Sequence, residues 1–238
     1  MGLEKTFTSE ELEISKKAFD WVKKSKRKII EIFASEKVYP KDDLPTTIFM
    51  AGSPGAGKTE FSIRLSESFK QKPVIIDADK VREHIDGYDG KKAYLFQRGA
   101  TKGVHVLFDH SCHKKLNIIL DGTFAYELAL QNVLRSIEIK RNIEIWFLYQ
   151  DPVLSWEFTK KREIKEKRNV PKHVFIEAYL KSIENVEEAK RVFGSKIKLN
   201  IVLKNFEKGI DRLELNKDIV APYIPKLYTS KELENILS

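Results

Sequence analysis

Short apolar runs alternate with amphipathic stretches along most of this 238-residue chain. The stretches between the runs, such as residues 60–70 and 93–115, carry apolar side chains at helical spacing. Strands that alternate with helices are typical of a parallel sheet covered on both faces. The pattern therefore predicts an α/β fold with a doubly wound, mainly parallel sheet, whose strands are residues 46–51, 73–77, 117–121, 143–149 and 197–202.

The N-terminal segment follows a helical pattern of its own. Thr8 followed by Glu11 is typical of a capping box that opens a helix. Residues 38–45, with two prolines and two aspartates, end the helical pattern. One apolar stripe runs between these limits and predicts an amphipathic helix, through Ile14, Ala18, Trp21, Val22, Ile29, Ile32 and Phe33.

These patterns predict two parts in the chain. Residues 1–45 are a helical addition that packs on the core or receives a partner. Residues 46–238 form the core domain, with a helical lid and a helical C-terminal tail that ends in a short helix at 229–237.

Residues 52–59 read Gly-Ser-Pro-Gly-Ala-Gly-Lys-Thr and complete the pattern G-x-x-x-x-G-K-[ST] between a predicted strand and a predicted helix. Successive backbone N–H groups and the positive end of the helix would point at one phosphate group. Lys58 would reach the β- and γ-phosphates, and the Thr59 hydroxyl would hold Mg²⁺. The sequence thus predicts a P-loop NTPase fold that binds ATP and Mg²⁺ through Gly52, Ser53, Pro54, Gly55, Ala56, Gly57, Lys58, Thr59 and Glu60.

Polar residues follow two of the predicted strands, at the edge of the sheet where ligands bind in such folds. They are Asp77 and Asp79 after one strand, and Asp121 and Thr123 after another. A carboxylate there can accept a hydroxyl proton during phosphoryl transfer. Asp79 lies further out of its strand than Asp77 and is the preferred base. The alternative is that Asp79 caps a helix that begins at Lys80.

The densest basic stretch, residues 158–172, follows the fourth strand, where nucleotide kinases carry a lid. Guanidinium groups bind phosphate oxygens bidentately, so Arg162 and Arg168 are candidate phosphate clamps. Alternating charge signs otherwise indicate a solvated helix face, and this interpretation holds for most of the lysines.

Composition and charge narrow the function classes. The net charge of +8 suits a polyanionic ligand such as a nucleotide, and would also suit RNA or an acidic partner. No interleaving of aromatic and basic residues indicates a strand-binding groove, so nucleic acid is not the expected ligand. The single cysteine, Cys112, fits a reducing compartment such as the cytoplasm. No apolar run reaches the roughly 18 residues that a membrane span needs.

The order of these motifs resembles the zeta toxin family of bacterial P-loop kinases, from about residue 46 to about residue 202. Its marks are the phosphate loop, then Val-Ile-Ile-Asp-Ala-Asp at 74–79, Leu-Asp-Gly-Thr at 120–123, and Arg162 with Arg-Asn-Val-Pro-Lys at 168–172. The resemblance implies an ATP-dependent kinase that phosphorylates the 3′-hydroxyl of UDP-N-acetylglucosamine, and an antitoxin protein as partner.

By the same resemblance, Asp79 acts as the base, and Lys58, Arg162 and Arg168 contact ATP. The resemblance also implies that Asp121 and Thr123 line the side that binds the acceptor. Further candidates for this side are Asp77, Asp79, Arg82 and His105.

The chain departs from the family pattern on the acceptor side. Asp121 stands where glutamate is typical, His105 where another glutamate is expected, and Phe-Ala-Tyr at 124–126 replaces an expected arginine. Lys80, Arg82 or His105 would have to substitute for that arginine. We therefore expect UDP-N-acetylglucosamine to bind with a raised KM. Alternative acceptors are another nucleotide sugar, a metabolite or a polynucleotide 5′-end, and an alternative of another class is a nucleotide-dependent binding module.

Overall fold

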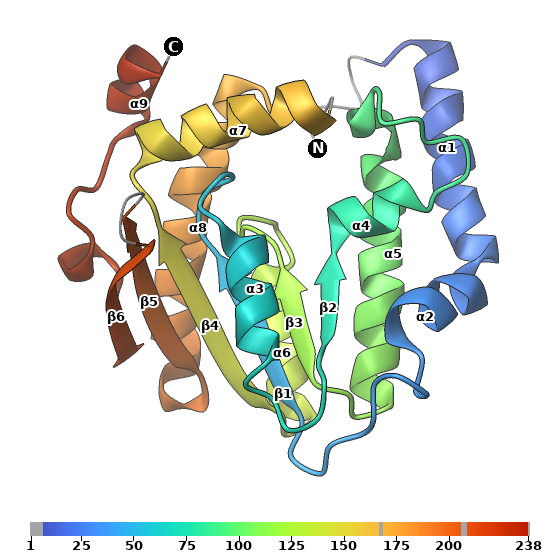
Figure 1. Ribbon diagram of the computed structural model, residues 1–238, viewed down its shortest axis with the longest axis horizontal. Coiled ribbons are helices and arrows are strands. Elements are labelled where there is room, and N and C mark those ends of the chain that lie inside the picture. Colours follow the sequence, from blue (N-terminus) through green and yellow to red (C-terminus); the bar gives the residue numbers. More distant parts are fainter. Residues whose placement is uncertain (1–6, 167–168, 206–208, 238) are drawn as a thin grey trace.

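The computed structural model describes residues 7–166, 169–205 and 209–237. These residues form a sheet with the strand order β2-β3-β1-β4-β5-β6 (Figure 1). Strands β1 to β5 run parallel, and β6 pairs antiparallel with β5. The predicted mainly parallel sheet is confirmed, and β6 adds an edge strand to the predicted ones. The strands are β1 (Thr46–Ala51), β2 (Val74–Asp77), β3 (Ile118–Asp121), β4 (Asn142–Tyr149), β5 (Lys198–Asn205) and β6 (Gly209–Lys217).

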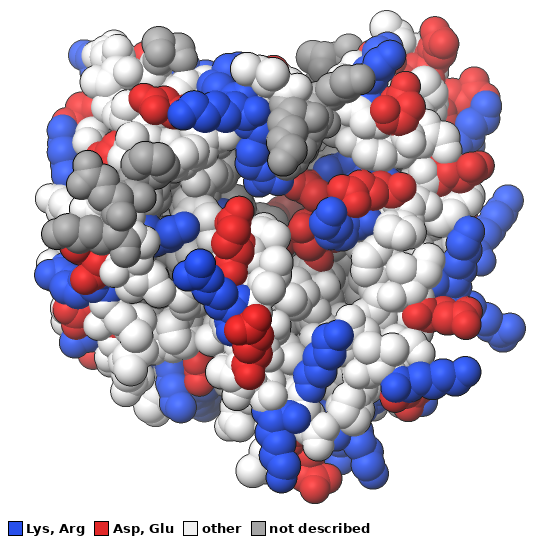
Figure 2. Space-filling view, viewed as in Figure 1, with Lys and Arg blue, Asp and Glu red and all other residues white. Residues whose placement is uncertain are grey.

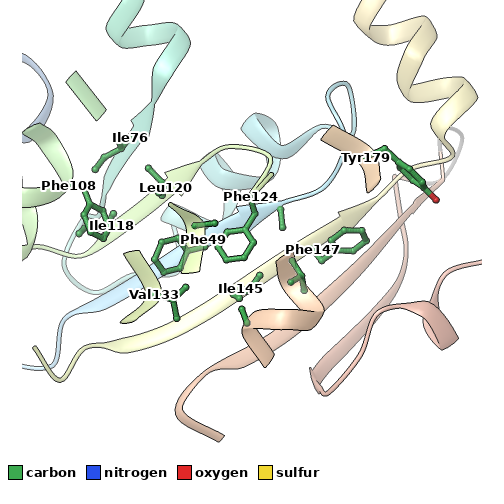
Figure 3. Packing of buried hydrophobic residues seen from close by; sticks show 14 of the residues in the cluster. Phe49, Ile76, Phe108, Ile118, Leu120, Phe124, Val133, Ile145, Phe147 and Tyr179 are labelled. Carbon is green, nitrogen blue, oxygen red and sulfur yellow. The ribbon is translucent and has the colours of Figure 1, made fainter. Parts of the chain in front are cut away.

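Helices cover both faces of the sheet, as a doubly wound fold requires. Alternate residues of β1 point to opposite faces. Ile48 and Met50 pack with α3 (Lys58–Ser66) in the smaller core. Phe49 points to the larger core, where its ring centroid lies 6.3 Å from that of Phe108 and 5.7 Å from that of Phe124 (Figure 3). The helices that pack on this larger core include α5 (Ala93–His113), α6 (Ala129–Glu138) and α8 (Lys172–Phe193).

Helix α7 (Pro152–Glu166) crosses over the carboxyl ends of the strands (Figure 1). It is joined to α8 by Trp156, whose ring packs edge-on against Phe175 with 5.2 Å between centroids. The predicted terminal helix is confirmed as α9 (Ser230–Ile236), which begins with a capping box at Thr229. None of the helices in the described residues combines the length and the hydropathy that crossing a bilayer requires.

The N-terminal stripe forms two helices, α1 (Ser9–Lys24) and α2 (Lys26–Ala34), and both contact α5. The capping box at Thr8 is confirmed, but the prediction of one continuous helix is wrong. The chain breaks at Ser25, whose φ of −98° and ψ of 18° are not helical, and α2 turns toward β2, which it also contacts. The stripe is thus bent to follow the surface of the core.

Two glycines of helix α5 allow neighbouring helices to pack closely against it. A Cβ at Gly99 would lie 3.1 Å from the backbone of Ala18 in α1. A Cβ at Gly103 would lie 2.4 Å from the Val81 side chain of α4 (Ala78–Glu83). Because glycine has no Cβ, α1 and α4 pack closely against α5, and α4 carries the predicted base.

Candidate active site

A cavity of about 750 Å³ opens at the carboxyl ends of the parallel strands. Figure 2 shows a hollow near the centre of this face, below the Lys and Arg side chains that lie over α7. The phosphate loop forms the floor of the cavity. One wall, the α5 side, comes from α5, α6 and the ends of β2 and β3; the other, the α7 side, comes from α7 and the β5–β6 hairpin. Of the predicted site residues, the cavity is lined by Pro54, Gly55, Gly57, Lys58, Thr59, Glu60, Asp77, Asp79, His105, Asp121, Thr123 and Arg162.

Some predicted residues do not line this cavity. Three of them belong to the phosphate loop and shape its backbone: Gly52, Ser53 and Ala56. The fourth is Arg82, which is buried behind the wall. Arg168 lies outside the described residues, so the prediction of a second clamp stays a prediction.

The phosphate loop takes its shape from glycines in the left-handed region and from a neighbouring helix. Gly55 has φ +76° and Gly57 has φ +78°, and Gly57 caps the start of α3. The N–H of Gly52 donates to Ser182 Oγ of α8 at 2.6 Å. Helix α8 therefore holds the start of the phosphate loop, and the glycines of the loop turn the chain into α3.

Lys58 lies in the floor of the cavity and is almost buried. Its ammonium group donates to Gly52 O at 3.0 Å and to Ser53 O at 2.6 Å. These bonds hold the side chain along the loop that precedes it. A lysine in this place can follow the oxygens of a bound phosphate chain.

Thr59 and Asp121 meet beside the loop. Burial raises the pKa of the Asp121 carboxyl above its ordinary value, while the Lys58 ammonium and a hydrogen bond with Thr59 lower it in part. Asp121 Oδ2 is buried and has no hydrogen-bond partner among the described residues. A desolvated carboxylate oxygen without a partner next to a hydroxyl group is a fitting place for a cation.

Asp77 at the end of β2 and Asp79 at the start of α4 have different roles. Asp77 Oδ1 accepts a hydrogen bond from the Asp79 N–H at 2.8 Å and so caps α4, which begins at Ala78. The alternative that Asp79 caps a helix is therefore wrong. The Asp79 carboxylate lines the cavity and accepts a hydrogen bond from Arg82 Nη1 at 2.5 Å.

Arg82, predicted to contact the acceptor, lies behind the cavity wall. Its side chain is only 2% exposed. Helical geometry explains this position, because a residue three places after Asp79 on α4 turns back toward it. Arg82 therefore contacts the predicted base, Asp79, and does not line the cavity where an acceptor would bind.

The predicted lid corresponds to helix α7, and the basic residues of this helix point in different directions. Arg162 and Lys161 line the cavity. Lys160 forms an ion pair with Glu163 at 2.5 Å instead. Guanidinium and ammonium groups on this wall face the phosphate loop across the cavity, as a lid over a nucleotide would.

Lys204, at the end of β5, is a cavity residue that the sequence patterns did not indicate. Its ammonium lies against the phosphate loop, because a Cβ built on Gly57 would be 2.0 Å from Lys204 Nζ. The strand-end rule could have found it, but the predicted strand stopped at residue 202, before Lys204. The lysine adds a positive charge beside the loop.

The α5 side carries neutral polar groups that also escaped prediction. Gln97 and Thr101 join the predicted His105 on one face of α5, at the spacing of a helical stripe. Burial lowers the pKa of His105 below its ordinary value, so the ring is neutral at pH 7. Burial raises the pKa of Tyr126 to about 12, and its hydroxyl accepts a hydrogen bond from Asn132 at 3.2 Å.

Charge divides the cavity into two sides. Among the described lining residues, the lysines and the arginine lie in the loop or on the α7 side: Lys58, Lys161, Arg162 and Lys204. The α5 side contributes the carboxylates of Asp77, Asp79 and Asp121, and the start of α3 contributes the carboxylate of Glu60 beside the loop. An anionic ligand group is therefore favoured at the loop, and a hydroxylated, uncharged group on the α5 side.

Comparison with known proteins identifies relatives of this chain. The sequence model of the zeta toxin family matches residues 29–214. No sequence among the curated proteins matches.

Two solved structures share the fold. One is a chain from the PezAT chromosomal toxin–antitoxin system of Streptococcus pneumoniae, with a TM-score of 0.61 and 15% identity over 98% of this chain and 88% of that chain. The other is a chain of AvrRxo1-ORF1:-ORF2 with ATP, with a TM-score of 0.56 and 13% identity over 85% of this chain and 65% of that chain.

Proposed function

Because the chain belongs to the zeta toxin family, we propose that it is a kinase that transfers the γ-phosphoryl group of ATP to a hydroxyl group of a small acceptor. The observation that carries the proposal is a single cavity lined by the phosphate loop, the Asp79 carboxylate and Arg162. A module that only binds a nucleotide needs no carboxylate across from its phosphate loop. The kinase is therefore preferred over the binding module.

In the proposed reaction the acceptor hydroxyl lies between Asp79 and the γ-phosphate. Its proton passes to Asp79 as its oxygen forms a bond to the γ-phosphorus, and the bond from that phosphorus to the bridging oxygen breaks to release ADP. Lys58 and Arg162 offset the negative charge on the transferred group. Arg168 remains the proposed second clamp.

Mg²⁺ fits Thr59 and Asp121, because a hydroxyl and an unpartnered buried carboxylate oxygen lie together there. The described residues contain no group of three or more His, Cys, Asp or Glu side chains that could hold a metal ion alone. Mg²⁺ commonly takes one or two protein ligands and completes its shell with phosphate oxygens and water. When bound, the ion would neutralise part of the phosphate charge.

The first acceptor we propose is UDP-N-acetylglucosamine, the acceptor that the family resemblance implies. Its diphosphate would meet no lysine or arginine among the described lining residues of the α5 side. Losing one charge-assisted hydrogen bond costs about 1.5–3 kcal/mol, or about ten- to a hundredfold in affinity. We therefore expect a raised KM. A hydroxylated acceptor without phosphate is the second candidate, favoured by the carboxylates and neutral polar groups of that side.

We also propose a protein antitoxin as a partner, in the cytoplasm. Support comes from the family and from the structural relative that belongs to the PezAT toxin–antitoxin system. The second relative is likewise a chain of a two-component complex, AvrRxo1-ORF1:-ORF2.

The test is a transfer assay with ATP, Mg²⁺ and a panel of nucleotide sugars, sugars, metabolites and a 5′-hydroxyl oligonucleotide, scored by a gain in mass of one phosphate. Asp79→Asn should keep ATP affinity and lower transfer by about 10² or more. Asp77→Asn is the matched control and should lose much less turnover than Asp79→Asn, because asparagine also caps helices. Equal losses in both variants would mean that the base is misassigned.

Two other results would contradict the proposed reaction or the proposed acceptor. If every acceptor stays unmodified while the protein binds ATP, the kinase proposal fails. If only the oligonucleotide gains phosphate, the zeta-like acceptor fails and the kinase reaction stands.

A further inference from the structure

Arg82 is among the largest fully buried side chains of the protein, although it is charged. A buried guanidinium without partners would cost several kcal/mol. The partners that the fold provides for it therefore indicate what it does.

The two terminal nitrogens of Arg82 are held by different helices. Nη1 donates to Asp79 Oδ1 of α4, and Nη2 donates to Gln97 Oε1 of α5, both at 2.5 Å. Gln97 Nε2 in turn donates to Thr101 Oγ1 at 3.3 Å. A chain of hydrogen bonds thus runs from Thr101 through Gln97 and Arg82 to the Asp79 carboxylate.

Both ends of this chain line the cavity, whereas Arg82 in its middle does not. Asp79 is at the cavity edge of α4, a helix of only six residues. Gln97 and Thr101 face the cavity from α5. The Asp79 carboxylate is therefore held by Arg82 of α4, and the Arg82 side chain is in turn hydrogen-bonded to Gln97 of α5.

We propose that Arg82 is a positioning residue that holds Asp79 in the orientation for proton transfer and ties this orientation to the acceptor contacts on α5. The inference rests on the proposed kinase function. Phosphoryl transfer depends mainly on positioning and electrostatics. A misplacement of about 1 Å can lower a rate by about 10²-fold. Lysine would keep the charge but not the rigid fork that reaches two acceptors at once.

The first experiment compares two buried arginines. Arg82→Lys should lower kcat about ten- to a hundredfold with the KM for ATP within about twofold, because the variant disturbs the base and not the phosphate loop. Arg141→Lys is the matched control. Arg141 is also buried, but it donates to Thr47 Oγ1, Thr46 O and Leu116 O at the amino ends of the strands, away from the cavity. Its replacement should lower the unfolding midpoint and leave kcat unchanged. Equal kcat losses in the two variants would overturn the proposal.

The second experiment is a double-mutant cycle with Asp79→Asn. In that background Arg82→Lys should change kcat by less than about twofold, because the residue it positions no longer acts as a base. The same fold-loss in both backgrounds would overturn the positioning role.

A cycle of the same variants in urea unfolding needs no acceptor. Arg82 and Asp79 should be coupled by at least about tenfold in the unfolding equilibrium constant, and additive effects would overturn the proposal. If the wild type modifies no acceptor, the kinase proposal fails on its own, and this unfolding cycle still decides whether Arg82 holds Asp79.

Discussion

Replacing Gly55 by alanine tests the contact between the phosphate loop and α7. Gly55 has φ +76° and Gly87 has φ +79°, so a side chain at either position meets the same left-handed strain. That strain is about 1–2 kcal/mol. The surroundings differ, because a Cβ on Gly55 would lie 2.1 Å from Ser155 O of α7, while a Cβ on Gly87 has no described atom within 4 Å. Gly87→Ala is therefore the matched control.

The size of the effect follows from how far the loop must move. A carbon and a carbonyl oxygen in contact stay about 3.3 Å apart, so relief requires a shift of about 1 Å. Ser155 is held in place: its N–H donates to Asp151 O at 2.8 Å, and its carbonyl accepts from Thr159 Oγ1 at 2.8 Å. The loop must therefore give way. A misplacement of this size costs about 10²-fold in rate.

Urea unfolding measures the cost of the strain at φ, and steady-state kinetics measure the effect of displacing the phosphate loop. Both variants should lose about 1–2 kcal/mol of unfolding free energy from the strain at φ. Only Gly55→Ala should lose about 10²-fold in kcat/KM for ATP. If the two variants have the same kcat/KM at a temperature where both are folded, the reasoning from the contact with α7 is refuted.

Three further changes test the walls of the cavity. Arg162→Ala should lower kcat more than it raises the KM for ATP, and Arg162→Lys should restore only part; a pure KM effect would make this arginine a ground-state contact. Lys204→Ala should raise the KM for ATP by roughly tenfold with kcat nearly kept, because its ammonium lies at Gly57; an unchanged KM contradicts this. Asp121→Asn should remove the part of the pH dependence of stability that Asp121 itself contributes. Since burial raises the native pKa of Asp121, the folded state binds more protons, and its contribution to stability falls as pH rises from the ordinary value to the native one. Thermal unfolding of both proteins across this window checks the sign: the stability of the wild type relative to the variant should fall as pH rises, and a rise contradicts the prediction.

The phosphate loop and its flanking elements could be predicted because their causes are local. The glycine spacing of the loop corresponds to positive φ at Gly55 and Gly57, which few other residues adopt. The apolar run before it is β1 with the predicted bounds, Thr46–Ala51. The carboxylates at strand ends came together at one edge because parallel strands end on the same side of a sheet.

Two features of the fold depend on contacts distant in sequence. Most residues of β6 are exposed, so the strand lacks the one-sided apolar pattern of a half-buried strand, and only its pairing with β5 defines it. The apolar stripe of α1 and α2 runs on without interruption, but both helices pack on α5 and the chain breaks at Ser25. Local periodicity carries no signal for either feature.

The cavity walls show the same limit. Gln97, Tyr126 and Lys204 are far apart in the chain and meet only in the fold. Arg82 follows the predicted base closely and was expected to face the acceptor. Its direction depends on the helical turn of α4 and on Gln97 from α5, which the sequence of α4 alone does not contain.

Nucleotide binding at Lys58 is an exchange of partners. Its ammonium has three N–H donors and already donates to Gly52 O and Ser53 O, so a phosphate group that takes more than one of these donors displaces a carbonyl oxygen. Only the difference between the two sets of bonds contributes to affinity, and bonds to an ionised oxygen are the stronger. A neutral ligand that displaced the carbonyls would leave the ammonium worse satisfied than before. The loop therefore discriminates against uncharged competitors more sharply than its affinity for ATP alone would indicate.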